Sequence, residues 1–184
     1  WCYIDSEQWW KVGDIVSEIR VDAIKTRAGA VPKAGDLGLN ITGTVLQVVS
    51  AEDDTNSSTT STSFQSTSVT ATITPSSTSS KILVICQINI KQDTGTANGS
   101  HMEAQIQRGG SAIGKTVDHG TRELAGTGNT DNVQTSPILT TLDSPSTTSA
   151  TTYTVFIRSK NTACTARINH DNGGSVMTLM EIAG

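Results

Sequence analysis

The chain carries a long Ser/Thr-rich segment that leads straight into its most apolar run. All but seven of residues 55–80 are Ser or Thr, and residues 81–90 read KILVICQINI. Short hydroxyl side chains hydrogen-bond to nearby backbone groups, so they suit turns and the exposed faces of strands. Apolar residues alternate with polar ones at Val69, Ala71 and Ile73, which is the period of a half-buried β-strand. This stretch therefore predicts exposed, β-rich structure.

Short segments of the same kind follow one another to the end of the chain. In residues 81–90 one face is apolar throughout, and the other face also begins with apolar residues. The residues predicted to point inward there are Ile82, Val84, Cys86, Ile88 and Ile90. The other predicted strands cover residues 44–49, 68–74, 102–108, 111–117, 135–142, 152–160, 164–169 and 175–183. About eight strands at this spacing predict an all-β fold, an antiparallel two-sheet sandwich of the jelly-roll type.

Turn signals separate these strands. Residues 108–111 (RGGS) and 170–174 (HDNGG) are each predicted to form a hairpin, because glycine adopts the positive φ that such turns need. Two further connections, 74–79 and 144–149, contain a proline followed by a run of Ser and Thr. Proline lacks a backbone donor and ends a strand. We expect both connections to cross between the sheets at one end of the sandwich, with their hydroxyl groups satisfying one another.

The first 43 residues differ from the head domain predicted for residues 44–184. Residues 1–16 contain all three tryptophans and are predicted to dock on another protein, because buried Trp side chains anchor interfaces. Residues 17–43 are predicted to form an extended β stalk with apolar side chains on both faces. Three copies wound together would bury them and cover the strand edges, so we expect a homotrimer. The predicted docking and assembly residues are Trp1, Trp9, Trp10, Ile19, Val21 and Ile24.

Charge and hydropathy argue against several classes of partner. The net charge is -4 and the 13 Lys and Arg residues form no basic run, whereas binding to nucleic acid needs a concentrated basic field. No apolar stretch reaches the roughly 18 residues of a membrane-spanning helix. The N-terminal residues lack the basic region and apolar core of a signal peptide. We therefore expect neither nucleic acid nor membrane as a partner.

The titratable residues show no catalytic spacing. His101, His119 and His170 are not placed as metal-ligand pairs, and Asp118 next to His119 does not by itself make a triad. No nucleophile elbow or phosphate-binding loop occurs in the sequence. We therefore predict no catalytic residue, no cofactor and no metal site, and expect that the protein is not an enzyme.

Two questions stay open from the sequence. Calcium takes carboxylate and amide oxygens from loops, which Asp53-Asp54, Asp131-Asn132 and Asp171-Asn172 could supply, although such residues are typical of ordinary turns. Cys2, Cys86 and Cys164 lack CxxC spacing. The last two lie in predicted strands, where small buried thiols are common, and a disulfide between them is left open.

The two Pro-Ser-Thr connections and the last strand carry a resemblance to known proteins. The segments are TITPSSTSSKILV (72–84), LDSPSTTSATTYTV (142–155) and TLMEIAG (178–184). They resemble the C-terminal domain of fibre-type virion proteins from marine tailed bacteriophages, cyanophages among them. Residues 17–26 (SEIRVDAIKT) resemble the start of such proteins, whereas residues 1–15 have no counterpart in them.

This resemblance implies a role in assembly and supplies no catalytic residue. It implies a structural virion protein, a trimeric tail fibre or appendage whose C-terminal domain is displayed on the virion surface for host attachment. The N-terminal segment would contact other virion proteins, and the head would meet a glycan or protein of the host surface. The alternatives are a capsid decoration or head-fibre protein, and a lectin-like adhesin that binds glycans.

Recognition of a host would fall to long polar loops. Residues 91–101 and 115–134 are predicted as such loops, and loops of this length commonly carry function. The candidate receptor-contact residues are Asp93, Asn98, His101, Asp118, His119, Arg122, Asn129 and Asp131.

Overall fold

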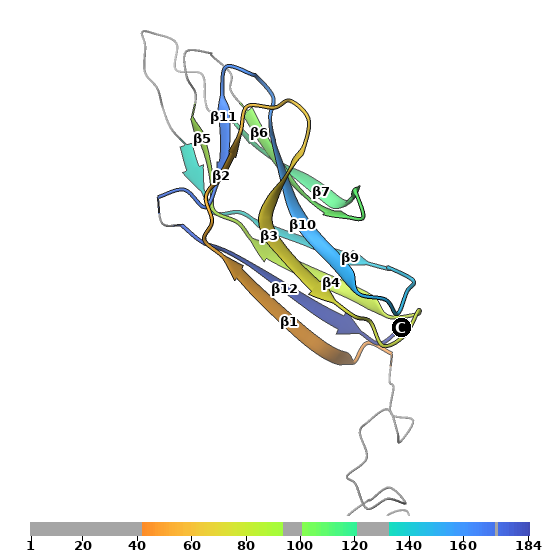
Figure 1. Ribbon diagram of the computed structural model, residues 1–184. Coiled ribbons are helices and arrows are strands. Elements are labelled where there is room, and N and C mark those ends of the chain that lie inside the picture. Colours follow the sequence, from red (N-terminus) through yellow and green to blue (C-terminus); the bar gives the residue numbers. More distant parts are fainter. Residues whose placement is uncertain (1–41, 94–100, 121–132, 172) are drawn as a thin grey trace, which may run out of the picture. The chain divides into compact units, whose positions relative to one another are not determined.

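A computed structural model describes residues 42–93, 101–120, 133–171 and 173–184, which all belong to one compact unit. This part is all-β and forms three antiparallel four-stranded sheets (Figure 1). None of the described residues forms a helix that is long and apolar enough to cross a membrane. The predicted docking segment and almost all of the predicted stalk lie outside the described residues.

The first sheet has the order β1 (Val45–Asp53), β12 (Ser175–Ile182), β4 (Lys81–Gln87) and β9 (Ile138–Asp143). The second has the order β3 (Gln65–Ile73), β10 (Thr151–Ser159), β6 (His101–Arg108) and β7 (Ser111–Gly120). The third has the order β2 (Ser57–Thr59), β11 (Thr165–Ile168), β5 (Ile90–Asp93) and β8 (Val133–Thr135).

The third sheet continues the first. Each strand of the third sheet is the next or previous strand along the chain to one in the first sheet, and the two occupy the same position in the strand orders of their sheets. Four long strands are thus each interrupted once, which turns eight strands into twelve. If each interrupted pair (β1 with β2, β4 with β5, β8 with β9, β11 with β12) is counted as one strand and the strands are numbered 1 to 8 along the chain, the two layers have the orders 1-8-3-6 and 2-7-4-5. This is the jelly-roll arrangement of two facing sheets. The predicted fold class is confirmed, whereas the number of strands is twelve because four of the eight expected strands are interrupted.

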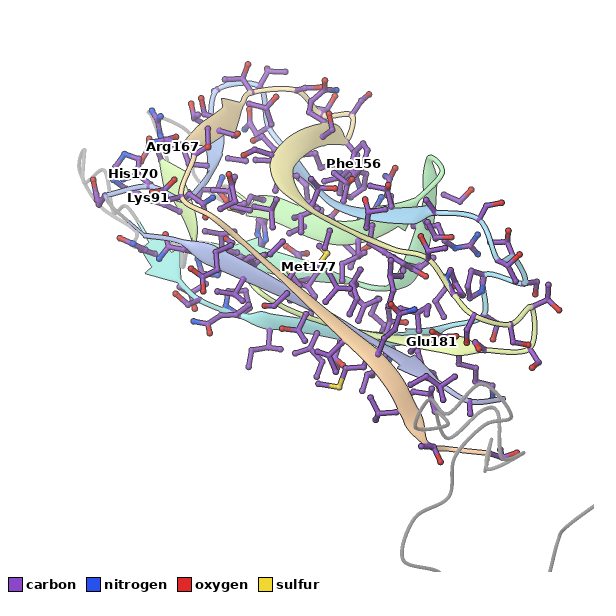
Figure 2. The ribbon with its side chains drawn as sticks, turned by 60° about the horizontal axis from the view of Figure 1, so that its bottom comes forward. Lys91, Phe156, Arg167, His170, Met177 and Glu181 are labelled. Carbon is purple, nitrogen blue, oxygen red and sulfur yellow. The ribbon has the colours of Figure 1, made fainter. Side chains whose placement is uncertain are left out.

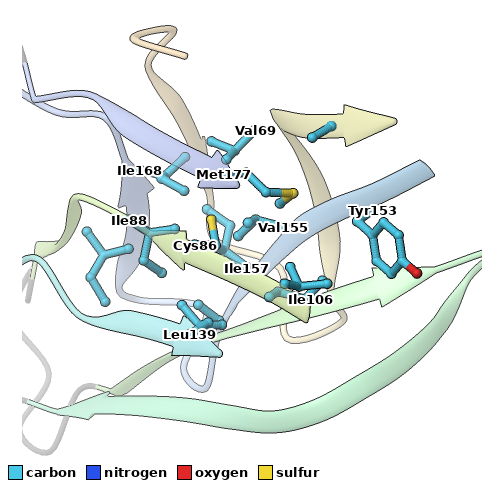
Figure 3. Close-up of a cluster of buried hydrophobic side chains, with 14 of the residues drawn as sticks. Val69, Cys86, Ile88, Ile106, Leu139, Tyr153, Val155, Ile157, Ile168 and Met177 are labelled. Atoms are coloured by element: carbon cyan, nitrogen blue, oxygen red, sulfur yellow. The ribbon is translucent and has the colours of Figure 1, made fainter. Parts of the chain in front are cut away.

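The core lies between the two layers and consists of the inward side of the predicted alternations (Figure 3). Each such side chain contributes about 1.5–3 kcal/mol when fully buried. Tyr153, Val155 and Ile157 face the core, whereas Phe156 is half-buried on the outer side of β10. Cys86 and Cys164 are buried as thiols and no disulfide joins them. Burial raises the pKa of the Cys86 thiol to about 12.

The hairpin predicted for residues 108–111 is confirmed, whereas the one predicted for residues 170–174 is wrong. Gly109 and Gly110 have φ of 57° and 83° and join β6 to its partner β7. In contrast, β11 pairs with β2 and β5 while β12 pairs with β1 and β4, so the chain continues from one sheet into the next. Asn169 and Asp171 turn the backbone here with φ of 56° and 55°.

Polar bonds join the strands at this interruption. The buried Asn169 side chain donates through Nδ2 to Asp53 Oδ2 (2.7 Å) and to the Thr55 carbonyl (3.2 Å). Its Oδ1 accepts a hydrogen bond from Ser175 Oγ (2.6 Å). The Asn169 backbone N–H donates to the Asn89 carbonyl (2.8 Å). These bonds satisfy buried groups that the sheet ladder leaves free, which is why the interruption is tolerated.

Both Pro-Ser-Thr connections cross between the layers, as predicted, and they lie at the same end of the sandwich (Figure 1). The expectation that their hydroxyls satisfy one another holds only in part. Ser77 Oγ accepts from the Ser79 N–H (3.2 Å), but Ser76 donates to the carboxylate of Glu181 instead. A buried carboxylate on a neighbouring strand therefore helps to hold the first connection in place.

Candidate interaction surfaces

The two outer faces of the sandwich differ in how many apolar side chains they carry. The outer face of the β3-β10-β6-β7 sheet carries hydroxyl and amide side chains that bond across strands. Thr72 Oγ1 lies 2.8 Å from Thr152 Oγ1, and Thr70 Oγ1 lies 3.1 Å from Thr154 Oγ1. Such pairs give an antiparallel sheet a stable face towards water.

A cluster of charged residues lies at one end of this polar face. Glu103 on β6 accepts from Arg158 Nε (2.6 Å) on β10 and lies 2.8 Å from Lys160 Nζ. Lys160 also bonds Asp118 Oδ2 on β7 (2.9 Å), which joins Asp118 to the cluster. The Arg158 guanidinium stacks over the Phe64 ring at 4.5 Å from its centroid.

The two carboxylates of this cluster are held in the ionised form. Burial acts to raise the pKa of Glu103, but the hydrogen bonds from Lys160 and Arg158 outweigh it and the pKa is lowered. The pKa of Asp118 is lowered mainly by its hydrogen bond to Lys160. Each acid thus has a cationic partner, and the cluster is a compensated ionic network.

The structure brings together some of the predicted receptor-contact residues and separates others. His101 Nδ1 lies 3.2 Å from Asp118 Oδ1, on the neighbouring strands β6 and β7. Asp93 lies on β5 and pairs with Arg167, beside Lys91 and His170 (Figure 2). The remaining members of that set, and the docking residues, lie outside the described residues: Asn98, Arg122, Asn129, Asp131, Trp1, Trp9, Trp10, Ile19, Val21 and Ile24.

The placement of Asp93, His101, Asp118 and His119 in loops is corrected, since all four lie in strands. Strand β7 was missed beyond its start; Gly114, with φ of 72°, lies where its pairing register with β6 shifts. Strand β5 was missed because Gln92 occupies a buried position where an apolar residue is expected. Contact of these residues with a receptor stays a prediction.

Two of the acids considered for calcium, Asp53 and Asp171, have protein partners. Asp53 Oδ2 accepts from Ser68 Oγ (2.7 Å) and from Asn169. Asp171 lies 2.7 Å from His170 Nδ1 and 3.7 Å from Lys91 Nζ. Across the described ranges, no three His, Cys, Asp or Glu side chains gather as metal ligands. Asp131 and Asn132 lie outside these ranges.

The outer face of the β1-β12-β4-β9 sheet carries one continuous apolar row, beside rows that also contain hydroxyl, amide and carboxylate side chains, and this row was not predicted from the sequence. Strand pairing aligns Val48, Met180, Leu83 and Leu142 in one unbroken row across all four strands. A sheet face in water normally carries polar residues at such positions. The sequence feature that could have predicted this row is the apolar residues at the start of the outward face of residues 81–90.

No family model matches the chain, and no curated protein matches it. Function therefore has to be inferred from the fold and its two outer faces.

Proposed function

We propose that this chain is a structural protein of a bacteriophage virion, without enzymatic activity. It is a trimeric tail fibre or appendage whose head, residues 44–184, is displayed on the virion surface for host attachment. The resemblance of the Pro-Ser-Thr connections and the last strand points to this role. The jelly-roll topology supports it, because viral coat and lectin domains are often built in this way. Support from the fold alone is by analogy.

One observation carries the proposal: the head combines an apolar outer face with a polar one. The apolar row through Leu83 and Leu142 suits burial against protein. The hydroxyl pairs and the network around Glu103 suit exposure to water, because their polar groups already have partners. A chain with one face for assembly and one for display fits a surface component of a particle.

The location on the particle can be tested with antibodies raised against the folded chain. We expect them to label intact particles of the virus that produces it in electron micrographs, and to label nothing after absorption with the purified chain. Label at the tail indicates a fibre, whereas label over the head indicates the decoration or head-fibre alternative. Labelling only of disrupted particles, or none, contradicts surface display.

The trimer can be tested on the purified chain. Light scattering at micromolar concentration should give three times the chain mass of 19.3 kDa. A single chain mass contradicts this part of the proposal.

A lectin-like adhesin is the second candidate, and Phe156 favours it. This half-buried ring lies on the polar outer face, with Ser66 on β3 and Gln105 on β6 as its neighbours across the strands (Figure 2). An aromatic face beside hydrogen-bonding groups suits a sugar ring. Binding on a glycan array that is lost in Phe156→Ala and kept in Thr152→Ala supports this candidate. An array without any signal removes it.

A further inference from the structure

The outer face of the β1-β12-β4-β9 sheet, here called the apolar face, has three aligned rows of side chains. The first is the apolar row of Val48, Met180, Leu83 and Leu142. The second joins Ile85 to Ser50, Thr178 and Thr140. The third joins Val176 and Ile138 to Glu52 and Gln87. Beyond the first row, Ile182 lies between Val45 and Lys81.

Several apolar side chains of this face are exposed in the single chain, whereas Leu83 and Met180 are half-buried. Ile138 is 62% exposed, Val48 56% and Leu142 55%. Their strand neighbours at alternate positions, such as Leu139 and Val84, fill the core instead. The apolar face is therefore an addition to the core and is not explained by the packing of the sandwich.

The size of the face suits a specific contact. Four strands about 4.8 Å apart, with eight residues along β12 at about 3.4 Å each, span about 19 by 27 Å. This is roughly 500 Å² of sheet per copy, so two facing copies cover about 1,000 Å², near the lower limit for a biological interface.

The charges of the face suit a second copy of the same chain. Lys81 and Glu52 are the ionisable residues that strands β1, β12, β4 and β9 place on it, and they lie at opposite ends. The other ionisable residues of these strands, Asp53, Glu181 and Asp143, lie at the alternate, inward positions. Each copy therefore presents a face without net charge, so copies do not repel one another.

We propose that copies of this chain associate through their apolar faces. This deepens the proposed function, because it identifies which surface of the head holds the assembly together. Burial of Val48, Leu142 and Ile138 between copies removes them from water, which stabilises the assembly by the hydrophobic effect.

A threefold arrangement fits the dimensions of the face. Three faces about 19 Å wide closed into a triangle lie about 5.5 Å from the shared axis, close to half the ~10 Å spacing of packed sheets. At this distance, side chains from three copies can reach the shared axis.

The test is the mass of the 184-residue chain in solution. We expect the double variant Val48→Lys/Leu142→Lys to fall from a multiple of 19.3 kDa to a single chain mass at micromolar concentration. The matched control, Thr70→Lys/Thr152→Lys, adds the same charge to exposed positions on the opposite outer face and should keep the wild-type mass. A far-UV circular dichroism spectrum checks that both variants are folded.

A milder variant covers the case in which the lysines prevent folding. Val48→Thr/Leu142→Thr introduces threonine, which favours strands. On dilution, this variant should dissociate to a single chain with a midpoint at a protein concentration at least tenfold higher than that of the wild type. Unchanged mass in both apolar-face variants overturns the inference but leaves a trimer intact. A monomeric wild type overturns both, and a dimer lost in the variants supports this contact while contradicting the trimer.

Discussion

The carboxylate of Glu181 accepts two hydrogen bonds from Ser76, one from its backbone N–H (2.7 Å) and one from its hydroxyl (2.6 Å). Gln47 Nε2 donates a third (2.6 Å). Glu181 is fully buried on the last strand, and Ser76 belongs to the first Pro-Ser-Thr connection. One acid thus links the end of the chain to the connection between the sheets and to the first strand (Figure 2).

Replacement of Glu181 should destabilise the fold without changing its architecture. Glu181→Gln keeps the shape but removes the charge that these donors bond, and we expect a loss of about 2–3 kcal/mol in the free energy of unfolding. Ser76→Ala removes only the hydroxyl bond and should cost about 1 kcal/mol. Urea denaturation at equal protein concentration measures both, and equal losses would contradict this ranking.

The contribution of Glu181 should depend on pH. Burial acts to raise its pKa, but the hydrogen bonds of Ser76 and Gln47 outweigh it and the pKa is lowered. A carboxyl with a lowered pKa in the folded state stabilises above its unfolded pKa and loses that contribution as the pH falls through the folded value. The difference in free energy of unfolding between wild type and Glu181→Gln should thus be constant at neutral pH and shrink below about pH 4. A difference that stays constant down to pH 3 would contradict the lowered pKa.

Asn169 combines a turned backbone with three side-chain bonds, and two variants separate these roles. Asn169→Gly keeps the positive φ but loses the bonds to Asp53, Thr55 and Ser175. Asn169→Ala loses the bonds and also strains the backbone, which adds about 1 kcal/mol. We expect the glycine variant to lose about 1–3 kcal/mol and the alanine variant about 1 kcal/mol more. Thermal unfolding in which alanine is the milder change would contradict this assignment.

A hydrogen bond between Tyr153 and Asp143 joins β10 to β9 beside the second Pro-Ser-Thr connection. The Tyr153 hydroxyl donates to Asp143 Oδ2 (2.8 Å), which also lies 2.6 Å from Arg108 Nε. Tyr153→Phe should cost about 1 kcal/mol, whereas Asp143→Ala should cost more because it leaves both Tyr153 and Arg108 without this acceptor.

Alkaline titration offers an independent readout for Tyr153. Burial, and then the hydrogen bond to Asp143, raise its pKa well above the ordinary tyrosine value. The absorbance change that disappears in Tyr153→Phe should therefore occur well above pH 10. A normal titration would show that the hydroxyl is exposed to water.

Much of the head could be predicted because the side chains of a strand alternate between its two faces, and this alternation is visible in the amino-acid sequence. The alternation of Ile82, Val84 and Cys86, or of Tyr153, Val155 and Ile157, shows which side chains face the core, since successive side chains point to opposite sides. The β6–β7 hairpin could also be predicted locally, because its turn needs positive φ and glycine adopts positive φ whatever its neighbours are.

The turn at residues 170–174 shows where this local reading fails. Its residues are typical of a hairpin, yet β11 and β12 continue in one direction because each has partners far away in the chain. The bonds of Asn169 to Asp53 and Thr55 cross more than 100 positions, and no local pattern records them.

The β class, most strand positions and the inward residues were thus predictable from the amino-acid sequence, because these follow from the period of the backbone. Which strands lie side by side depends instead on pairing between distant segments, which is visible in the folded chain. Val48, Leu83, Leu142 and Met180 are each unremarkable in the sequence, and they become one apolar row because strand pairing joins segments from both ends of the head. The candidate surface for assembly exists at that level alone, since it depends on register between distant strands.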